Sequence, residues 1–342
     1  MTKPILSVLI DTYNHERYIE QAVVSALEQD FPASDYEIVV VDDGSTDRTP
    51  EIVRKFAPRV RLISKGNGGQ ATAFNAGVPQ LRGEIVSFLE GDDRFAPGKL
   101  MRIMETLERN PQVAGAGHGY HQFDEENGQT SVRLPQSETA LSLDTPEAAH
   151  EAYLGWAFVI TSALTVRKRV LEQSVPVPAE LRFCADVPIV VTALAGGISL
   201  VAEPLFYYRH HSDNLFAVGE GSEGKLRRRA EMTELAFELT EPLMIRLGVR
   251  RDSITAFLNP SWVEASRFLL GAFGGSRLKT LKTEMRAFRM DNRNPKLKYQ
   301  LFKYLFVGAA TLALPSRQFY RARQWYGEKN LGRFREQFAR SR

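Results

Sequence analysis

Acidic and glycine-rich residues follow apolar runs in the first hundred residues of this 342-residue chain. One apolar run ends at Asp11, a second at Asp42-Asp43-Gly44, and a third at Glu90-Gly91-Asp92-Asp93. Lys65 precedes the turn Asn67-Gly68-Gly69-Gln70, which leads into a helical pattern. Backbone N–H groups, a helix dipole and one cation can together bind a diphosphate. The same glycines also suit a tight turn that needs positive φ, so the turn has two explanations.

The elements that must position these residues alternate along the chain. We expect strands at 5–10, 36–41, 60–64 and 84–89, and helices that begin near 19, 50 and 71. Continuously apolar strands that alternate with helices predict a parallel sheet covered on both faces. Ligands of such sheets bind outside the carboxyl ends of the strands, where the acidic and glycine-rich residues gather.

The rest of the chain is less regular. Residues 124–145 are polar and predict an exposed loop, and residues 186–195 predict a helix that ends at Gly196-Gly197. Short strands at 198–201 and 205–208 are expected to complete a first domain, with a boundary near residue 215. Helical periodicity over 225–247, 261–273 and 296–314 indicates a second, helical region.

Several motifs resemble the glycosyltransferases of family 2, in the order seen in that family. They are SVLIDTYN, SALEQDFP, EIVVVDDGSTDRT, NGGQATAFNAG, GEIVSFLEGDDRFAPGKL and YYRHHSDN, and they span about residues 5–215. The resemblance implies an α/β, GT-A-like (Rossmann-like) fold with a mostly parallel sheet flanked by helices, a catalytic domain at 1–215 and a basic helical region at 216–342. No GxGxxG follows the first strand, so a dinucleotide-binding site lacks its fingerprint.

By this resemblance the first strand-end turn, Thr12-Tyr13-Asn14, and Asp43 bind the donor nucleotide. The Asp43 carboxylate would accept from an N–H of the base, for which a charged acceptor is suited. Lys65, Asn67 and Gln70 would lie at the diphosphate. From composition alone, a plain turn is the favoured explanation of Asp42-Asp43-Gly44.

Glu90-Gly91-Asp92-Asp93 occupies the place of the acidic metal motif of the family, which is normally Asp-x-Asp. Asp92 and Glu90 would bind Mg²⁺ or Mn²⁺, hard ions that take carboxylate and phosphate oxygens. The ion would neutralise the leaving nucleoside diphosphate. Glu90 stands where Asp is usual, and Asp93 is a candidate donor or acceptor contact. The alternative is an acidic loop that caps the following helix.

Similar enzymes place a general base at a helix start about a hundred residues after the metal motif, where this chain has Asp186. The base takes the proton of the attacking hydroxyl. The usual acidic partner is replaced by Ala185, and Asp186 is also explained as a helix cap. We assign the neighbouring Cys184 to packing.

The family's Tyr-Arg-x-His corresponds to Tyr208-Arg209-His210-His211, which makes Arg209 and His211 candidate donor or acceptor contacts. Neighbouring histidines of a strand point to opposite faces, so His210 and His211 cannot form a metal pair alone. We assign His118 and His121 to structural roles.

The implied activity is transfer of a sugar, UDP-linked by expectation, from a nucleoside diphosphate to a hydroxyl acceptor with inversion, in the assembly of cell-surface polysaccharide or glycolipid. The departures at Glu90 and Ala185 leave open a nucleotide-sugar-binding protein without catalysis. A nucleotidyltransferase, which would release pyrophosphate, uses the same kind of sheet. The saccharide or lipid-linked acceptor is not specified by the sequence, because fold similarity does not fix substrates.

Charge divides the chain unevenly. Residues 276–342 hold 17 Lys and Arg against 4 Asp and Glu, a net charge of +13, whereas residues 1–275 have a net charge of −10. Aromatic and aliphatic residues accompany the positive charge: Leu301, Phe302, Tyr304, Leu305 and Phe306, with Lys298, Lys303, Arg317, Arg321 and Arg323. This composition suits an amphipathic segment on an anionic membrane surface, and equally a helix packed on the catalytic domain.

A single cysteine predicts a cytoplasmic protein, because secreted proteins more often carry disulfides. The apolar stretch at 304–314 has 11 residues, too few for a helix that spans a membrane. We therefore expect at most a peripheral association with the cytoplasmic face of the membrane. Nucleic acid is not an expected partner, because the basic region contains no known nucleic-acid-binding motif.

Overall fold

A computed structural model describes residues 3–125, 128, 130–211, 214, 223–291 and 307–323. The chain forms two compact units, one of Met1–Glu220 and Leu235–Phe257 and the other of Gly221–Glu234 and Leu258–Arg342. The first unit contains the sheet and all the candidate site residues. The described residues of the second unit are mostly helical.

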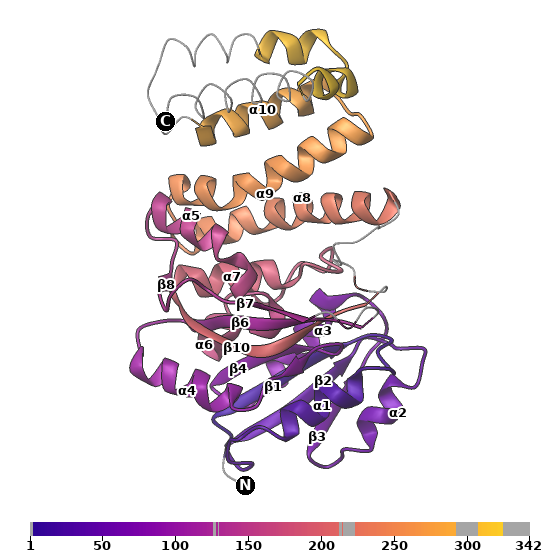
Figure 1. Cartoon of the computed structure of the whole chain (residues 1–342), viewed down its shortest axis with the longest axis vertical. Helices are drawn as coiled ribbons and strands as arrows, with labels where there is room; N and C mark the ends of the chain where they lie inside the picture. Colours follow the sequence, from indigo (N-terminus) through magenta and orange to yellow (C-terminus); the bar gives the residue numbers. More distant parts are fainter. Residues whose placement is uncertain are drawn as a thin grey trace. The chain divides into compact units, whose positions relative to one another are not determined.

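Four parallel strands form the N-terminal half of the sheet, in the order β3-β2-β1-β4 (Figure 1). They are β1 (Leu6–Thr12), β2 (Tyr36–Asp42), β3 (Val60–Ser64) and β4 (Ile85–Glu90). The helices between and after them are α1 (Ile19–Leu27), α2 (Thr49–Arg54), α3 (Gln70–Gly77) and α4 (Lys99–Arg109). The predicted strand and helix alternation is therefore confirmed, with small shifts at the element ends.

Side chains alternate between the two faces of these strands, and both faces are buried. Leu6, Val8 and Ile10 pack in one core cluster with residues of α1 and α4. On the opposite face an added Cβ at Gly77 of α3 would lie 2.8 Å from the side chains of both Leu9 and Val41. Burial on both faces explains why the strands are continuously apolar and confirms the expected α/β class.

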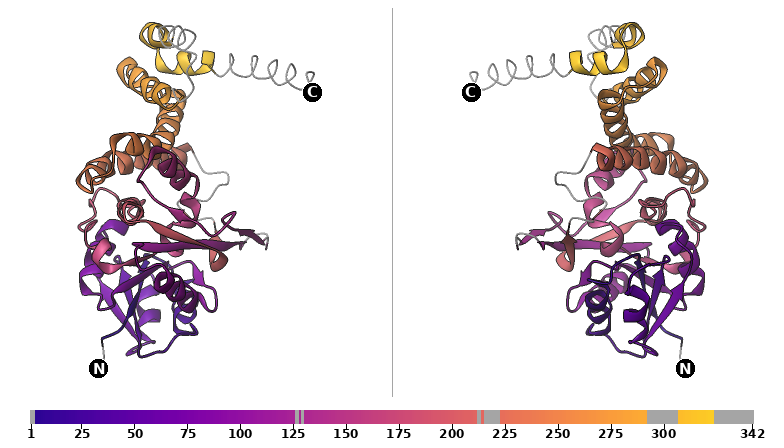
Figure 2. Two further views of the ribbon diagram at one scale, coloured as in Figure 1. Left: turned by 90° about the vertical axis from the view of Figure 1, so that its left-hand side faces the viewer. Right: turned by 90° about the vertical axis from the view of Figure 1, so that its right-hand side faces the viewer.

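Beyond β4 the sheet becomes mixed. Its order continues β9-β6-β10-β5, with β9 (Thr165–Arg167) antiparallel to both β4 and β6. The long strands β6 (Gly115–Asp124) and β10 (Ile198–His210) run parallel to each other (Figure 2). The edge strand β5 (Arg94–Phe95) pairs with β10. The two short strands expected at 198–201 and 205–208 are one strand, because two irregularities around Pro204 interrupt its pairing without ending it.

The expected loop at 124–145 is partly wrong. It contains β7 (Thr130–Arg133), which pairs antiparallel with β6, and β8 (Ala140–Leu141), which pairs with β10. All four residues of β7 are exposed, so the strand lacks the apolar signal by which strands are predicted from sequence. Helix α5 (Pro146–Leu154) follows, with Thr145 as its cap, and α6 (Lys168–Leu171) and α7 (Asp186–Ala195) complete this part.

The C-terminal helices are α8 (Glu223–Arg246), α9 (Arg251–Ala272) and α10 (Arg277–Asp291). A helical C-terminal region is therefore confirmed, although α9 begins ten residues before its prediction and α10 was not predicted. Residues 307–313 are also helical, whereas residues 296–306 of the last predicted helix lie outside the described residues. Arg267 of α9 pairs with Glu284 of α10 at 3.0 Å.

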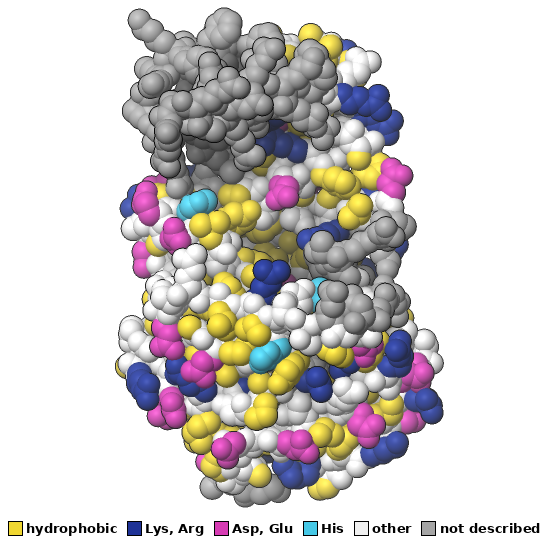
Figure 3. Space-filling view, viewed as in Figure 1, with side chains coloured by type: hydrophobic (Ala, Val, Ile, Leu, Met, Phe, Trp, Pro, Cys, Tyr) yellow, Lys and Arg dark blue, Asp and Glu magenta, His cyan; other side chains and the backbone are white. Residues whose placement is uncertain are grey.

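Among the helices that the structure describes, none combines the length and the apolar character needed to cross a bilayer. On the face drawn in Figure 3, acidic and basic side chains are interspersed over the sheet-containing unit. That face therefore carries no large field of a single sign.

Candidate active site

The carboxyl ends of the parallel strands are tied together by the first backbone atoms of the loops that leave them. The N–H of Asp43 donates to the Thr12 carbonyl at 2.9 Å, and the N–H of Gly91 donates to the Asp11 carbonyl at 2.9 Å. Asp11 and Glu90 are direct partners in the register of β1 and β4. The acidic residues predicted at separate strand ends are thus neighbours in space.

Asn14 joins the first loop to the loop after β2. Its amide oxygen accepts from the N–H of Thr46 at 2.8 Å, and its own N–H donates to the Ser45 hydroxyl at 2.9 Å. Asn14 adopts a φ of 55°, a left-handed conformation that Asn tolerates better than most residues. Tyr13 beside it is 43% exposed, and the Thr12 hydroxyl contacts the His15 ring at 3.2 Å. Tyr13 therefore presents an accessible ring on a fixed loop.

Asp43 and Lys65 form a close ion pair. The Lys65 ammonium donates to Asp43 at 2.5 Å, to the Gly66 carbonyl at 2.6 Å and to the Thr72 hydroxyl at 2.7 Å. The Asp43 carboxylate also accepts from the N–H groups of Gly68 and Gly69. All three protons of the Lys65 ammonium are thus used within the protein. Its predicted contact with a diphosphate remains a prediction and requires the side chain to turn away from Asp43.

The glycine-rich turn contacts a distant part of the chain. Gly69 has a φ of 87°, and a Cβ added to it would lie 2.5 Å from the Cα of Arg182. The Arg182 guanidinium donates to the amide oxygen of Asn67 at 2.5 Å. Glycine at position 69 therefore meets both a backbone and a packing requirement.

Gln70 connects three parts of the site through one side chain. Its amide nitrogen donates to Asp11 at 3.2 Å and to Glu90 at 3.1 Å. Its amide oxygen accepts from the N–H of Ala185 at 3.2 Å. Position 185, where the family usually has an acid, therefore contributes its backbone to this junction. Gln70 orients the two carboxylates, and its predicted donor contact stays a prediction.

Glu90, Asp92 and Asp93 form a group that could hold a cation, with one carboxylate oxygen of each within 4.8 Å of the others. The Asp92 carboxylate accepts from the His211 ring at 3.1 Å and from the Asn214 amide at 3.2 Å. The side chain of Asp92 remains 13% exposed, whereas Asp93 is almost fully buried. Oxygen ligands of this kind suit Mg²⁺ and Mn²⁺.

Crowding shifts the pKa values of these carboxyl groups in different directions. Burial, reinforced by the charge of Asp92, raises the pKa of Glu90 and of Asp93 well above their ordinary values. Burial would also raise the pKa of Asp92, but His15 and His211 outweigh it and lower that pKa. Asp92 is therefore the most readily ionised member of the group.

Asp11 adds a further buried carboxyl group beside this set. Burial raises its pKa to about 7, the Asp92 charge adds to the rise, and the hydrogen bond from Gln70 opposes it. The Oδ1 atom of Asp11 is buried without a hydrogen-bond partner. An orphaned carboxylate oxygen next to further carboxylates marks excess negative charge, which a bound cation would offset.

Asp186 is the first residue of α7, and burial raises its pKa to about 6 against opposing hydrogen bonds that include one from Thr161. Its charge raises the pKa of both Asp11 and Glu90, which places it close to the acidic group. A pKa near the working pH suits a general base. Cys184, two residues earlier, has a φ of 61° at the turn into the helix.

Arg209 is only 4% exposed and holds several loops together. Its guanidinium donates to the Asp92 carbonyl at 2.8 Å, to Glu125 at 2.5 Å and to Gln21 at 2.7 Å. It also lies over the Tyr18 ring at 4.8 Å. Arg209 and His211 therefore both contact Asp92, by different atoms, and their predicted contacts with the donor or acceptor stay predictions.

Some side chains at this site were not predicted. They are His15 and Asn214 beside Asp92, Gln21 and Glu125 beside Arg209, and Ser162 and Lys99 beneath the acidic group. Asn214 and Lys99 belong to the quoted motifs YYRHHSDN and FAPGKL, which could have pointed to them. Ser162 has no sequence signal. His118 is fully buried, in agreement with a structural role.

Comparison with known proteins agrees with this geometry. Residues 7–174 match the model of the family Glycosyl transferase family 2. An uncharacterized glycosyltransferase of Nostoc sp. is 36% identical over 251 residues, which cover 71% of this chain and 76% of that protein.

Two solved structures share the fold at lower identity. Residues 1–349 of Staphylococcus aureus TarS in complex with UDP-GlcNAc align with a TM-score of 0.55 and 20% identity, over 93% of this chain and 91% of that one. The mannosyltransferase PcManGT of Pyrobaculum calidifontis, in complex with GDP-Man and Mn²⁺, aligns with a TM-score of 0.50 and 20% identity, over 90% and 87%. The chain has the GT-A fold, belongs to glycosyl transferase family 2 and is a nucleotide-sugar glycosyltransferase.

Proposed function

We propose that this glycosyltransferase moves a sugar from a UDP-linked donor to a hydroxyl acceptor, with inversion, using Asp186 as general base. The observation that carries the proposal is that the glycine-rich turn, the acidic group and a carboxyl with a pKa of about 6 meet at one end of the sheet. Family membership supplies the reaction class.

The surroundings of Asp43 favour uracil over guanine. Each oxygen of its carboxylate already accepts hydrogen bonds from Lys65 or from the N–H groups of Gly68 and Gly69. Little acceptor capacity remains, which suits the single N3–H donor of uracil better than the paired N–H donors of guanine. The UDP-GlcNAc complex of TarS is consistent with this choice, whereas the GDP-Man complex of PcManGT leaves it to experiment.

Glu90 and Asp92 are proposed to hold a divalent ion. Their oxygens lie within 4.8 Å of each other, and the excess negative charge around Asp11 fits a cation. A bound Mn²⁺ or Mg²⁺ would supply Lewis-acid stabilisation of the leaving diphosphate. His211 and Asn214 fix the orientation of the Asp92 carboxylate for this role.

In the proposed displacement, the acceptor oxygen forms a bond to the anomeric carbon as the bond from that carbon to the diphosphate oxygen breaks. The hydroxyl proton passes to the Asp186 carboxylate, and the electron pair leaves with UDP. Attack from the face opposite the leaving group inverts the anomeric centre. Asp186 must be ionised to accept the proton, so activity is expected to depend on its pKa.

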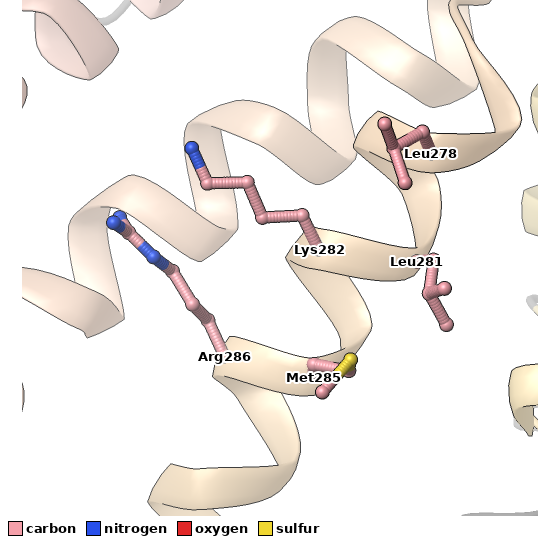
Figure 4. A pocket seen from close by; sticks show the side chains of 5 residues that line it. All are labelled: Leu278, Leu281, Lys282, Met285 and Arg286. Carbon is pink, nitrogen blue, oxygen red and sulfur yellow. The ribbon is translucent and has the colours of Figure 1, made fainter.

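The sugar acceptor is proposed to be a saccharide or a lipid-linked hydroxyl at an anionic membrane surface. In the second unit, Leu278 is 74% exposed on α10, and Leu281 and Met285 lie along the same helix (Figure 4). Lys282 and Arg286 extend from α10 toward the Trp262 ring, and Arg317 and Arg321 are exposed.

Part of the predicted amphipathic segment lies outside the described residues, namely Lys298, Leu301–Phe306 and Lys303. Arg323 pairs with Glu284, so part of the positive charge is used within this unit.

The nucleotide proposal predicts that UDP binds with Mn²⁺ at least about tenfold more tightly than without it, because Asp92 would hold the ion and the ion would offset the negative charge of the diphosphate. Calorimetric titration of UDP and GDP, with and without MnCl₂, measures this. Asp92→Ala should lose the Mn²⁺ enhancement, whereas Asp144→Ala, at an exposed position, should keep it. Absence of binding of either nucleotide under both conditions would contradict the proposed site.

The base proposal predicts that Asp186→Asn lowers kcat by about 10²–10⁴-fold while UDP affinity is unchanged. Because the base must be ionised and its pKa is about 6, kcat should fall as pH drops below 6 and level off above it. UDP release from UDP-N-acetylglucosamine and other UDP-sugars provides the assay, with Asp144→Asn as control. Normal turnover of Asp186→Asn would remove this residue from the mechanism.

The raised pKa of Asp11 predicts that Asp11→Asn increases the stability of the folded protein. With a folded-state pKa of about 7, wild-type Asp11 loses stabilisation as pH rises from about 4 to 7, because folding then opposes its ionisation. The melting temperature of Asp11→Asn should exceed that of wild type by a few degrees at pH 8, and the difference should shrink at pH 5. Exposed Asp30→Asn should show neither effect. A lower melting temperature of Asp11→Asn than of wild type at pH 8 would contradict the raised pKa of Asp11.

The membrane proposal predicts co-sedimentation of the full chain with vesicles that contain phosphatidylserine and none with pure phosphatidylcholine. Arg317→Gln with Arg321→Gln should weaken binding about 30-fold, because the two cations contribute about 1 kcal/mol each near the surface and about 1.4 kcal/mol is a factor of ten. The pair Arg54→Gln and Arg59→Gln, exposed in the first unit, is the control. Equal sedimentation with both kinds of vesicle would exclude an electrostatic membrane contact.

A further inference from the structure

Ser162 lies fully buried in the short 3₁₀ turn η3 (Thr161–Ala163), and its hydroxyl contacts both ends of the acidic turn. It accepts from the N–H of Glu90 at 3.0 Å and donates to the Asp93 carboxylate at 2.6 Å. A hydroxyl has one proton to donate and two lone pairs to accept with. Ser162 therefore uses its donor on Asp93 while it holds the backbone of Glu90.

Asp93 is held on both carboxylate oxygens by groups of the protein. Ser162 donates to one oxygen, and the N–H of Arg209 donates to the other at 3.0 Å. The N–H of Asp93 itself closes the turn by donating to the Glu90 carbonyl at 3.0 Å. Asp93 is 1% exposed. A carboxylate that is buried and hydrogen-bonded at both oxygens in this way supports the turn.

Lys99, at the start of α4, contacts the backbone of Ser162. Its side chain is fully buried, and its ammonium donates to the Ser162 carbonyl at 2.7 Å while lying 3.7 Å from the centre of the Phe95 ring. Lysine is almost never fully buried unless it is paired, because removing an ammonium from water is costly. The chain retains this costly arrangement directly beneath the acidic turn.

We propose that Ser162 and Lys99 are positioning residues that, through Asp93, fix Glu90 and Asp92 in the arrangement that binds the metal–diphosphate. This inference rests on the proposed function of the same site and adds residues to it. It also divides the three acidic residues by role: Glu90 and Asp92 are ligands, and Asp93 is part of the support. Partners that orient metal ligands typically change metal affinity 10- to 100-fold when they are removed.

The test is calorimetric titration of MnCl₂ into the full-length protein in the presence of saturating UDP. Ser162→Ala should weaken Mn²⁺ binding about 10- to 100-fold, because Asp93 and the Glu90 N–H lose their common partner. Ser174→Ala is the matched control, since Ser174 is also buried and its hydroxyl donates to the carbonyl of Leu171 at 2.7 Å. Ser162→Thr keeps the hydroxyl and should recover a large part of the affinity.

Lys99→Met gives a second variant that keeps the apolar stem and removes the donor to Ser162. It should weaken Mn²⁺ binding in the same direction, and it serves as the test if Ser162→Ala does not fold, as judged by circular dichroism. If folded Ser162→Ala and Lys99→Met both bind Mn²⁺ as tightly as Ser174→Ala, this proposal is overturned and the proposed function stands. If the unaltered protein binds no Mn²⁺ with UDP, the proposed function itself fails.

Discussion

The concentration of carboxyl groups at one end of a parallel sheet is the constraint to which the rest of the site responds. Asp11 and Glu90 are direct partners on adjacent strands, and the charges of Asp92 and Asp186 reach both. Such crowding destabilises a folded chain, since each ionised group disfavours ionisation of the next. The surrounding donors limit this cost: Gln70 binds two of the carboxylates, and His211 and Asn214 bind a third. Such a cluster is compatible with a bound cation, since functional sites commonly reduce the stability of a fold.

The order of the strands and helices could be predicted because both faces of β1 to β4 are buried, which makes those segments continuously apolar. The strand-end location of Asp43, Glu90 and Asp92 followed from that order, since parallel strands place their carboxyl ends at one edge. The sequence also predicted that Asp186 begins a helix, which is what α7 shows. These successes share one cause, which is that local patterns and the topology of the fold agree.

The remaining features depend on contacts between distant segments and leave no local pattern. The exposed strand β7 has no apolar alternation, and the irregular pairing around Pro204 made one strand resemble two. A lysine near the start of a helix is usually exposed, whereas Lys99 is buried and donates to the carbonyl of Ser162. The ammonium of Lys65 binds the carboxylate of Asp43, a partner that the sequence does not name, and the predicted contact of Lys65 with the phosphates stays a prediction. A sequence gives the residue types of such contacts and not their partners.

Gln70 connects two parts of the proposed active site. It lies at the start of α3, immediately after the glycine-rich turn, and its side chain reaches both the acidic ends of β1 and β4 and the turn that precedes Asp186. The backbone beside it is fixed to the same distant turn, because the N–H of Gln70 donates to the Arg182 carbonyl at 2.8 Å. The glycine-rich turn is therefore linked by hydrogen bonds to the segment that precedes α7. In the proposed reaction, donor binding and the placement of the base would share the Gln70 amide.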